Sequence, residues 1–119
     1  MARFRDIGYR RRRHPRTPIA AFCDILAPDL GRILARGCIK NFSRGGLAVV
    51  TPTHVFQGRR VGILIDGLPQ KKWIVARVMN VRNSTERVYS CGLQFEGLGL
   101  LVRNRIESRL KKLALAKFA

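Results

Sequence analysis

Six short apolar stretches, separated by turn-forming residues, run through most of the chain. They are rich in Val, Ile, Leu, Ala and Phe, and several alternate apolar and polar residues as strands with one buried face do. The stretches span residues 18–26, 33–41, 47–51, 61–65, 72–81 and 87–95. Six short strands at nearly regular spacing predict an antiparallel β-barrel, because closure removes exposed sheet edges. Turns are expected at residues 27–31, at 66–67 and at 83–85.

The apolar spacing changes from a strand period to a helical period after Gly99. One apolar stripe consists of Val102, Ile106, Leu110 and Leu113. The other faces carry the cations Arg103, Arg105, Arg109, Lys111, Lys112 and Lys117. We therefore expect a helix over residues 100–117 whose apolar stripe seals one end of the barrel while its cations face water. A helix dedicated to a partner or a membrane surface is the alternative.

Length and composition indicate one domain with a single modest core. The chain has 119 residues, 46% of them hydrophobic, which places it among globular domains of ordinary size. Residues 1–10 are expected to form a flexible basic arm, and residues 11–119 the single domain. Arginines follow the first residues where a secretory signal would be apolar, and no apolar stretch is long enough to span a bilayer. A cytoplasmic protein without transmembrane segments is expected.

The charge is extreme for a chain of this size. The formal net charge is +17, from 24 Lys and Arg against 7 Asp and Glu. Such a field attracts polyanions in general, so nucleic acid, anionic membranes and acidic proteins are all candidate partners.

Catalytic and metal-binding patterns are missing from the sequence. The three cysteines, Cys23, Cys38 and Cys91, are odd in number and have no CxxC spacing, so buried thiols are expected in place of a disulfide framework or zinc site. No paired carboxylates, catalytic triad order or P-loop occurs. His54 is expected at the surface, and Trp73 in the core or at its rim, with stacking on a base as the alternative. The chain is therefore interpreted as a binding module, not an enzyme, without cofactor or metal.

Asn41, Ser43 and Gly46 form a polar group at the end of the second expected strand. The two-residue period of a strand predicts that the Asn41 amide and the Ser43 hydroxyl point to the same face. Gly46 has no Cβ, which allows either a sharp turn or the close approach of a ligand to the backbone. We expect a small polar ledge there, with an opening beside it.

Arg12 and Arg16 are the one pair of arginines four positions apart in the N-terminal segment. Pro15 favours an extended conformation before it, so the pair is expected on an extended loop and not on one helix face. Four extended residues span roughly 13 Å. Two guanidinium groups at that separation can bind different parts of one nucleotide-sized anion.

These two motifs together resemble those of PilZ domains, bacterial receptors for the second messenger cyclic di-GMP. Arg12-x-x-x-Arg16 is similar to the family's RxxxR motif, and Asn41-x-Ser43-x-x-Gly46 is similar to its [D/N]xSxxG motif. Residues 91–95, Cys-Gly-Leu-Gln-Phe, resemble the closing strand of the domain. The resemblance covers the chain from Arg11 onward and implies an RxxxR loop over residues 11–17, a barrel over 18–96 and the C-terminal helix.

The resemblance also implies roles for individual residues. Arg12 and Arg16 would contact phosphates and guanines, Asn41 and Ser43 would hold a second guanine edge, and Gly46 would leave room for the ligand. In PilZ domains, an arginine at the position of Arg11 is associated with the binding of two stacked cyclic di-GMP molecules in place of one. The arm would then fold over the barrel when the ligand binds and signal to an effector protein.

Two other functions remain open from the sequence. A basic small barrel that binds nucleic acid would explain the +17 charge, but it would not explain the spacing of Asn41, Ser43 and Gly46. A PilZ-like adaptor that does not bind the nucleotide is the third hypothesis, since Asn41 stands where Asp is also common.

Overall fold

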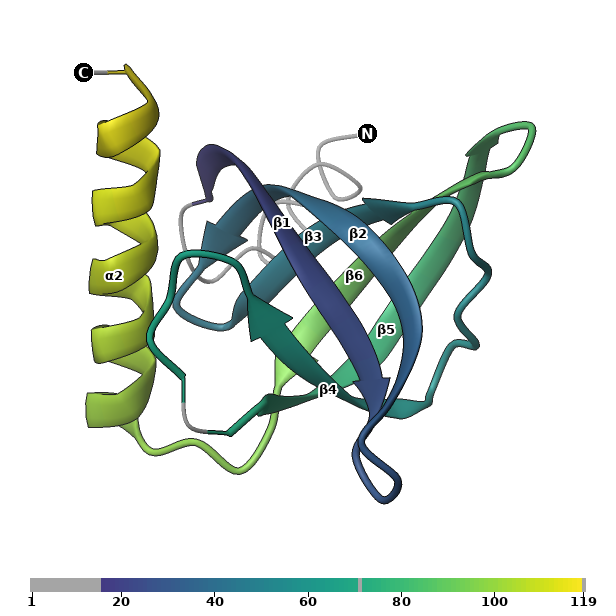
Figure 1. Cartoon of the computed structure of the whole chain (residues 1–119), viewed down its shortest axis with the longest axis horizontal. Helices are drawn as coiled ribbons and strands as arrows, with labels where there is room; N and C mark the ends of the chain where they lie inside the picture. The colour runs from purple at the N-terminus through teal and green to yellow at the C-terminus, as the bar shows by residue number, and fades with distance from the viewer. Residues whose placement is uncertain (1–15, 71, 119) are drawn as a thin grey trace, which may run out of the picture.

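The computed structural model describes residues 16–70 and 72–118, which form a closed six-stranded barrel with a helix along one flank (Figure 1). The strands are β1 (Thr17–Ala27), β2 (Arg32–Ser43), β3 (Gly46–Thr51), β4 (Arg60–Ile65), β5 (Ile74–Thr85) and β6 (Val88–Phe95). They pair antiparallel in the order β1-β2-β3-β6-β5-β4, and β4 returns to β1. The predicted antiparallel barrel is confirmed. The expected arm and the residues Arg11 and Arg12 lie outside the described part of the chain.

The β5–β6 hairpin is longer than the sequence pattern predicted. The expected turn at residues 83–85 is wrong, because these residues continue β5 and the turn lies at Glu86 and Arg87. Strand pairing continues past a register shift between Asn83 and Thr85. The chain reverses direction at Arg87, which has a left-handed φ of 62°. The end of the hairpin is exposed and projects away from the helix (Figure 1).

The core lies inside the barrel and follows the strand alternation. In β1, Ile19, Ala21, Cys23 and Ile25 are buried while the residues between them face outward. Cys23 and Cys91 are buried and Cys38 is half-buried, all as free thiols. Burial, helped by the nearby Asp24 carboxylate, raises the pKa of the Cys23 thiol to about 12, and burial also raises the pKa of Cys91. Such thiols stay protonated and unreactive near neutral pH.

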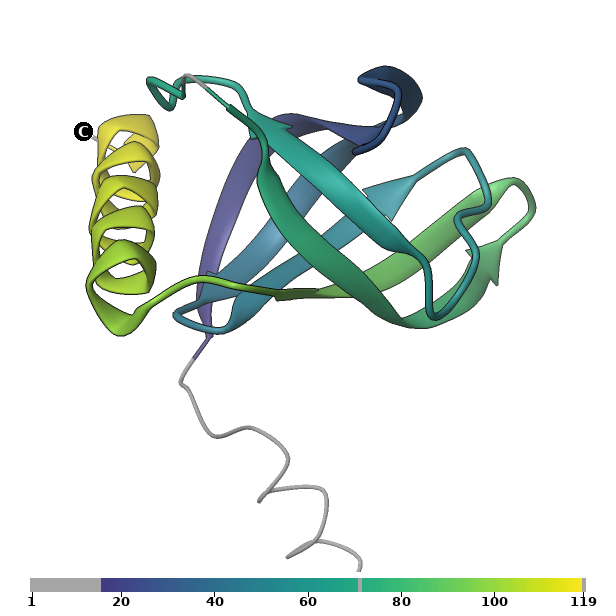
Figure 2. The same ribbon diagram turned by 90° about the horizontal axis from the view of Figure 1, so that it is seen from below.

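The C-terminal helix, α2 (Leu100–Phe118), packs against β1 and β2 at the flank of the barrel (Figure 2). Ile106, Leu110 and Ala114 are buried against the barrel. Val102, predicted as part of this stripe, is exposed, because each step of four residues advances about 40° beyond a full helical turn and carries Val102 out of contact. The rest of the predicted stripe is confirmed. Within the described residues, the helix lacks an apolar stretch of the length that a bilayer crossing needs.

Strands β3 and β6 approach closely at Gly46. A Cβ placed on Gly46 would lie 1.9 Å from the carbonyl oxygen of Leu93 in β6. No side chain fits into that space, so Gly46 is required by the packing of one strand backbone against the other. The sequence indicated a turn or a ligand approach for this glycine, and the structure adds a reason within the sheet itself.

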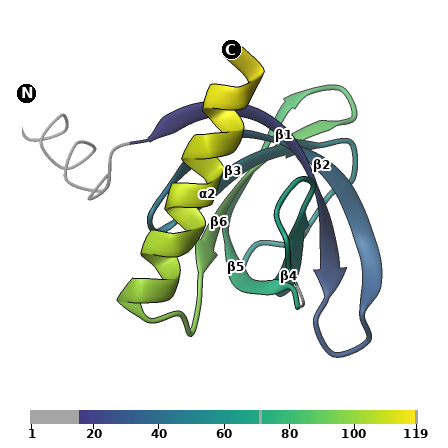
Figure 3. The same cartoon turned by 60° about the vertical axis from the view of Figure 1, so that its left-hand side comes forward.

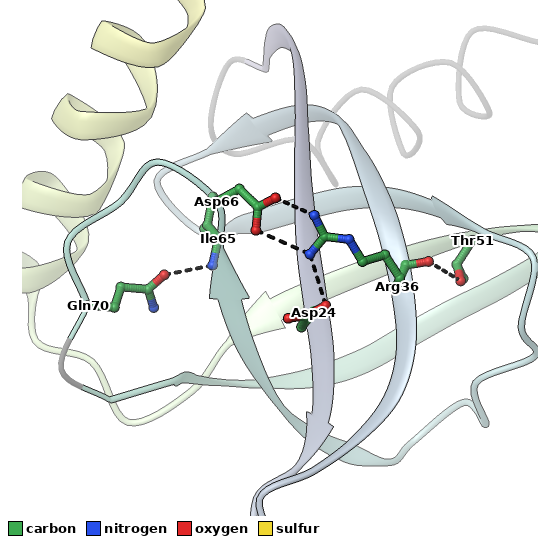
Figure 4. Close-up of polar contacts among 6 residues, drawn as sticks. All are labelled: Asp24, Arg36, Thr51, Ile65, Asp66 and Gln70. Carbon is green, nitrogen blue, oxygen red and sulfur yellow. Dashed lines mark hydrogen bonds and ion pairs between the residues drawn. The ribbon is translucent and has the colours of Figure 1, made fainter.

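An ionic cluster centred on Arg36 joins three segments on the outside of the barrel (Figure 4). Arg36 Nη1 in β2 donates to Asp24 Oδ1 in β1 at 3.0 Å and to Asp66 Oδ1, just after β4, at 3.2 Å. Arg36 Nη2 also donates to Asp66 Oδ2. These hydrogen bonds hold the pKa of Asp66 below its ordinary value. The cluster therefore fixes β1 between its two neighbouring strands by side chains as well as by backbone pairing.

Gln70 supports the same region from the loop after β4 (Figure 4). Its Oε1 accepts a hydrogen bond from the Ile65 backbone nitrogen at 2.7 Å, and its Nε2 donates to the Ile63 carbonyl at 3.2 Å. An amide side chain thus pairs with backbone groups at the end of β4 as a neighbouring strand would, and satisfies them there.

Replacing Asp66 by Asn tests the Arg36 cluster through its pH dependence. Since the pKa of Asp66 is lowered in the folded state, its ionised form stabilises the protein above the ordinary value of 3.8 and this stabilisation is lost as the pH falls through the folded pKa. We expect Asp66→Asn to be slightly less stable at pH 7, the effect being small because the carboxylate is half exposed. Urea unfolding should show this deficit shrinking as the pH is lowered below 3.8.

Asp29→Asn is the matched control for that measurement. Asp29 is exposed in the turn after β1 and makes no ion pair with a described residue, so its replacement should leave the pH profile unchanged. A deficit in Asp66→Asn that is the same at every pH would contradict the ionic role of Asp66.

Gly46→Ala tests the close approach of β3 and β6. The added methyl group would meet the backbone of Leu93, so we expect a loss of about 3 kcal/mol or more in unfolding free energy, or failure to fold. Gly92→Ala is the control within the same pair of strands, since its added Cβ would meet only the end of the exposed Asn80 side chain. It should cost about 1 kcal/mol or less. Equal stability losses in urea unfolding would contradict the packing role of Gly46.

Candidate functional site

The two sequence motifs meet at the end of the barrel where β1 begins and β2 ends. Thr17 pairs with Phe42, and Pro18 pairs with Asn41. This register carries Arg16 alongside Asn41, and Arg16 Nη1 donates to Asn41 Oδ1 at 2.9 Å. Two residues 25 positions apart, one from each motif, are thus in direct contact. Arg12, the other arginine of the first motif, and Arg11 beside it lie outside the described residues.

A bulge in β2 decides which side chain of the second motif reaches the surface. Ile39 pairs with Val49 and Asn41 with Ala48, so Lys40 is an extra residue in β2. Strict alternation from the buried Ile39 would send Asn41 into the core. The bulge leaves Asn41 half-buried at the surface and turns Phe42 into the core instead. The position of Asn41 beside Arg16 follows from this one extra residue.

Ser43 differs from the exposed hydroxyl that the strand period suggested. Its side chain is only 5% exposed, and its Oγ accepts a hydrogen bond from the Gly45 backbone nitrogen at 3.2 Å. Such a contact from a serine to the backbone two residues ahead stabilises a tight turn. In the structure Ser43 therefore shapes the loop that joins β2 to β3.

Arg44, in the same turn, links the motif to the helix. Its Nε lies 3.8 Å from Glu107 Oε1 in α2, and the adjacent Gly45 carbonyl accepts a hydrogen bond from the Phe95 nitrogen at 2.9 Å. The turn is held by both α2 and β6. The sequence analysis did not predict this contact. Its one indication in the sequence is that Glu107 is the only acid in the helical stretch.

Most of the acidic residues that the structure describes are held in ion pairs. The sequence has seven acids, of which Asp6 is not described, and four of the remaining six pair with arginines. Asp24 and Asp66 pair with Arg36, Glu96 with Arg60 and Arg77, and Glu107 with Arg44. Hydrogen bonds from Arg77, and then from Arg60, lower the pKa of Glu96.

The two acids without an ion pair among the described residues are Asp29 and Glu86. They lie in the β1–β2 and β5–β6 turns. Both turns are at the end of their hairpins remote from Asn41. Lys40, next to Asn41 in the sequence, is exposed at the motif end, and such a cation favours an anion there.

His54 and Trp73 do not join the motif. His54 is exposed and makes edge contacts with the Phe56 and Tyr89 rings, at centroid distances of 4.9 and 5.1 Å, which confirms its predicted surface position. Trp73 is half-buried and covers Gly62, where an added Cβ would lie 2.5 Å from its Cδ1 atom. It is thus a rim residue as predicted, on the side of the β1–β2 turn. Among the described residues, no three His, Cys, Asp or Glu side chains gather as a metal site would require.

Comparison with solved structures finds the same fold in other proteins. The chain is similar to the PilZ domain of YcgR from Escherichia coli, solved with c-di-GMP, at 16% identity and a TM-score of 0.67 over 87% of this chain and 91% of that one. It is similar to the MrkH–c-di-GMP complex of K. pneumonia at 24% identity and a TM-score of 0.66, over 89% of this chain and 53% of that one.

A third similar structure is the inhibitor of motility MotI/DgrA from Bacillus subtilis, at 19% identity and a TM-score of 0.63, over 90% of this chain and 52% of that one. The chain thus spans about half the length of the MrkH and MotI structures. Comparison with curated proteins by sequence found no significant match. The family model for the PilZ domain matches residues 10–112, and because this match covers most of the chain and the barrel agrees with it, the chain belongs to the PilZ domain family.

Proposed function

We propose that this chain is a receptor for cyclic di-GMP, which it binds at the end of the barrel where Arg16 contacts Asn41. The observation that carries the proposal is the 2.9 Å hydrogen bond between these two residues, because it joins the RxxxR and NxSxxG motifs at one place. The described structures of YcgR and MrkH are of complexes with c-di-GMP, which supports the same class of ligand here. The role is that of a binding protein and not of an enzyme.

The chemistry of the ligand matches these side chains. Cyclic di-GMP has two phosphates and two guanines, and each guanine edge offers O6 and N7 as neighbouring acceptors. A guanidinium fork meets such a pair, or two phosphate oxygens, with parallel hydrogen bonds. Asn41 orients the Arg16 guanidinium, and Arg12 would supply the second fork. The Asn41 amide group would contact the other guanine edge.

Ser43 and Gly46 act in this proposal by shaping the loop. Ser43 holds the turn through the Gly45 nitrogen, and Gly46 allows β3 to lie against the Leu93 carbonyl. Arg44 of the same turn forms a 3.8 Å ion pair with Glu107. The ligand would therefore meet a loop whose backbone is already held in position, which lowers the entropy cost of binding.

The residues before Arg16 would provide the signal. Arg11 would allow two stacked ligand molecules to bind, and residues 1–10 would change position as Arg12 engages the ligand. This movement would alter the basic surface that an effector protein in the cytoplasm meets.

Nucleic-acid binding is the second candidate, favoured by the net charge of +17. The affinity for a phosphate backbone would depend on the number of cations that contact it and would fall steeply as the salt concentration rises. It would not require the Arg16–Asn41 contact. A PilZ adaptor that does not bind the nucleotide is the third candidate, and titration with the ligand separates it from the first.

Replacing Arg12 and Arg16 by Lys separates these candidates by chemistry at constant charge. Lysine keeps each positive charge but cannot form the planar fork. Losing a charge-assisted contact at each position costs about 1.5–3 kcal/mol, so we expect the double variant to lose cyclic di-GMP affinity by about a hundredfold or more. Calorimetric titration measures this affinity and also the stoichiometry, which we expect to be two ligands per chain for the unaltered protein.

Arg32→Lys with Arg82→Lys is the matched control, since both arginines are exposed and lie away from the motif end. This variant should bind cyclic di-GMP as the unaltered protein does. GTP and cyclic di-AMP should bind to the unaltered protein and to both variants more weakly than cyclic di-GMP binds to the unaltered protein. Binding of a DNA duplex at two salt concentrations should be the same for all three. Retained cyclic di-GMP affinity in the Arg12/Arg16 variant, or a parallel loss of DNA binding, would contradict the proposed site.

A further inference from the structure

The side of α2 that faces away from the barrel carries exposed leucines. Leu101 is 80% exposed and Leu115 is 70% exposed. They are 14 residues apart, close to four full helical turns, so they lie on nearly the same line along the helix. Figure 3 shows α2 along the flank of the barrel, with one side against the strands and the other toward solvent. Leu100 and Val102 add further exposed apolar surface at the start of the helix.

Cations surround these leucines on the outward side of α2. Arg105, Arg109, Lys111 and Lys112 are all exposed. The one acid of the helix, Glu107, is only 18% exposed in its side chain and faces Arg44 on the barrel side. Across residues 100–115, where the side chains are described, the outward face of α2 thus has positive charge and leucines but no carboxylate.

We propose that this outward face of α2 binds the surface of a bilayer that contains anionic phospholipids. The cations match the charge of the lipid phosphates, and each one near an anionic surface is worth about a fivefold gain in binding. The leucines would enter the boundary between headgroups and acyl chains, which is the usual position of the apolar residues of an interfacial helix. This surface is separate from the proposed cyclic di-GMP site and does not depend on that site.

The leucines distinguish a lipid surface from nucleic acid as the partner. A phosphate backbone would be bound by the cations alone, and Leu101 and Leu115 would remain in water. The two leucines are about 21 Å apart along the helix axis, with the cations between them. A flat anionic surface with an apolar interior lets both leucines and all four cations make contact at once, because the barrel lies on the opposite side of the helix (Figure 3).

Charge reversal on α2 tests the electrostatic part of the proposal. The full chain is sedimented with vesicles of phosphatidylcholine, or with vesicles in which phosphatidylglycerol replaces about a third of it. We expect binding to the anionic vesicles only, and about a hundredfold loss in the variant Arg105→Glu, Arg109→Glu, Lys112→Glu. The control, Arg32→Glu, Arg59→Glu, Arg82→Glu, has the same change in net charge on exposed residues of the barrel and should lose less than about tenfold.

Replacing the leucines tests the apolar part and identifies the partner. Leu101→Ser with Leu115→Ser leaves every charge in place and alters only exposed positions, so thermal unfolding should be unchanged. We expect about a tenfold loss or more in binding to anionic vesicles, with unchanged binding to a short DNA duplex.

Three results would overturn the proposal. The first is failure of the full chain to bind the anionic vesicles, and the second is an equal loss of binding in the α2 and barrel charge variants. The third is full vesicle binding by the leucine variant, which would mean that only cations act and that α2 is a general polyanion surface. Loss of cyclic di-GMP binding in the Arg12/Arg16 variant does not bear on these results, so the two proposals fail separately.

Discussion

Strand β1 pairs with both β2 and β4, and the barrel, the packing of the helix and the contact between the two motifs all follow from this pairing. It closes the barrel, gives α2 a surface to pack on, and sets Thr17 opposite Phe42, which carries Arg16 to Asn41. The Arg36 cluster strengthens this closure from outside, since one guanidinium binds Asp24 of β1 and Asp66 at the end of β4. The fold therefore brings Arg16 and Asn41, from two distant segments of the chain, into contact.

The bulge at Lys40 decides which neighbouring side chains of β2 reach the surface. It keeps Asn41 at the surface and gives the core Phe42 instead. The following turn is held by Ser43, by the backbone contact of Gly45 with Phe95 and by the pair between Arg44 and Glu107. Packing and polar contacts thus determine the shape of the loop, so the motif residues have structural roles as well as any role toward a ligand.

Much of the fold could be predicted from the sequence, because alternation in strands such as β1 and the change of period after Gly99 are local signals. The burial of Ser43 could not be predicted, because it goes with a turn contact to the Gly45 nitrogen that the strand period does not show. The bulge at Lys40 could not be predicted either, since a bulge depends on pairing with another strand. Nor could the contact of Arg44 with Glu107, or the extension of β5 beyond residue 83, which depend on tertiary contacts and on a register shift. The motif spacing did indicate Arg16 and Asn41 as parts of one site, and the structure brings them into contact.

Backbone amide shifts in NMR spectra would report whether cyclic di-GMP binds where Arg16 contacts Asn41, as we propose. A 13.5 kDa chain gives resolved amide signals. On addition of cyclic di-GMP, we expect shifts concentrated at Arg16 and at residues 41–46, with little change in the β1–β2 turn or in the turn of the β5–β6 hairpin. Binding at Arg16 and Asn41 would be contradicted by the absence of shifts at saturating ligand, or by shifts concentrated in the β1–β2 and β5–β6 turns.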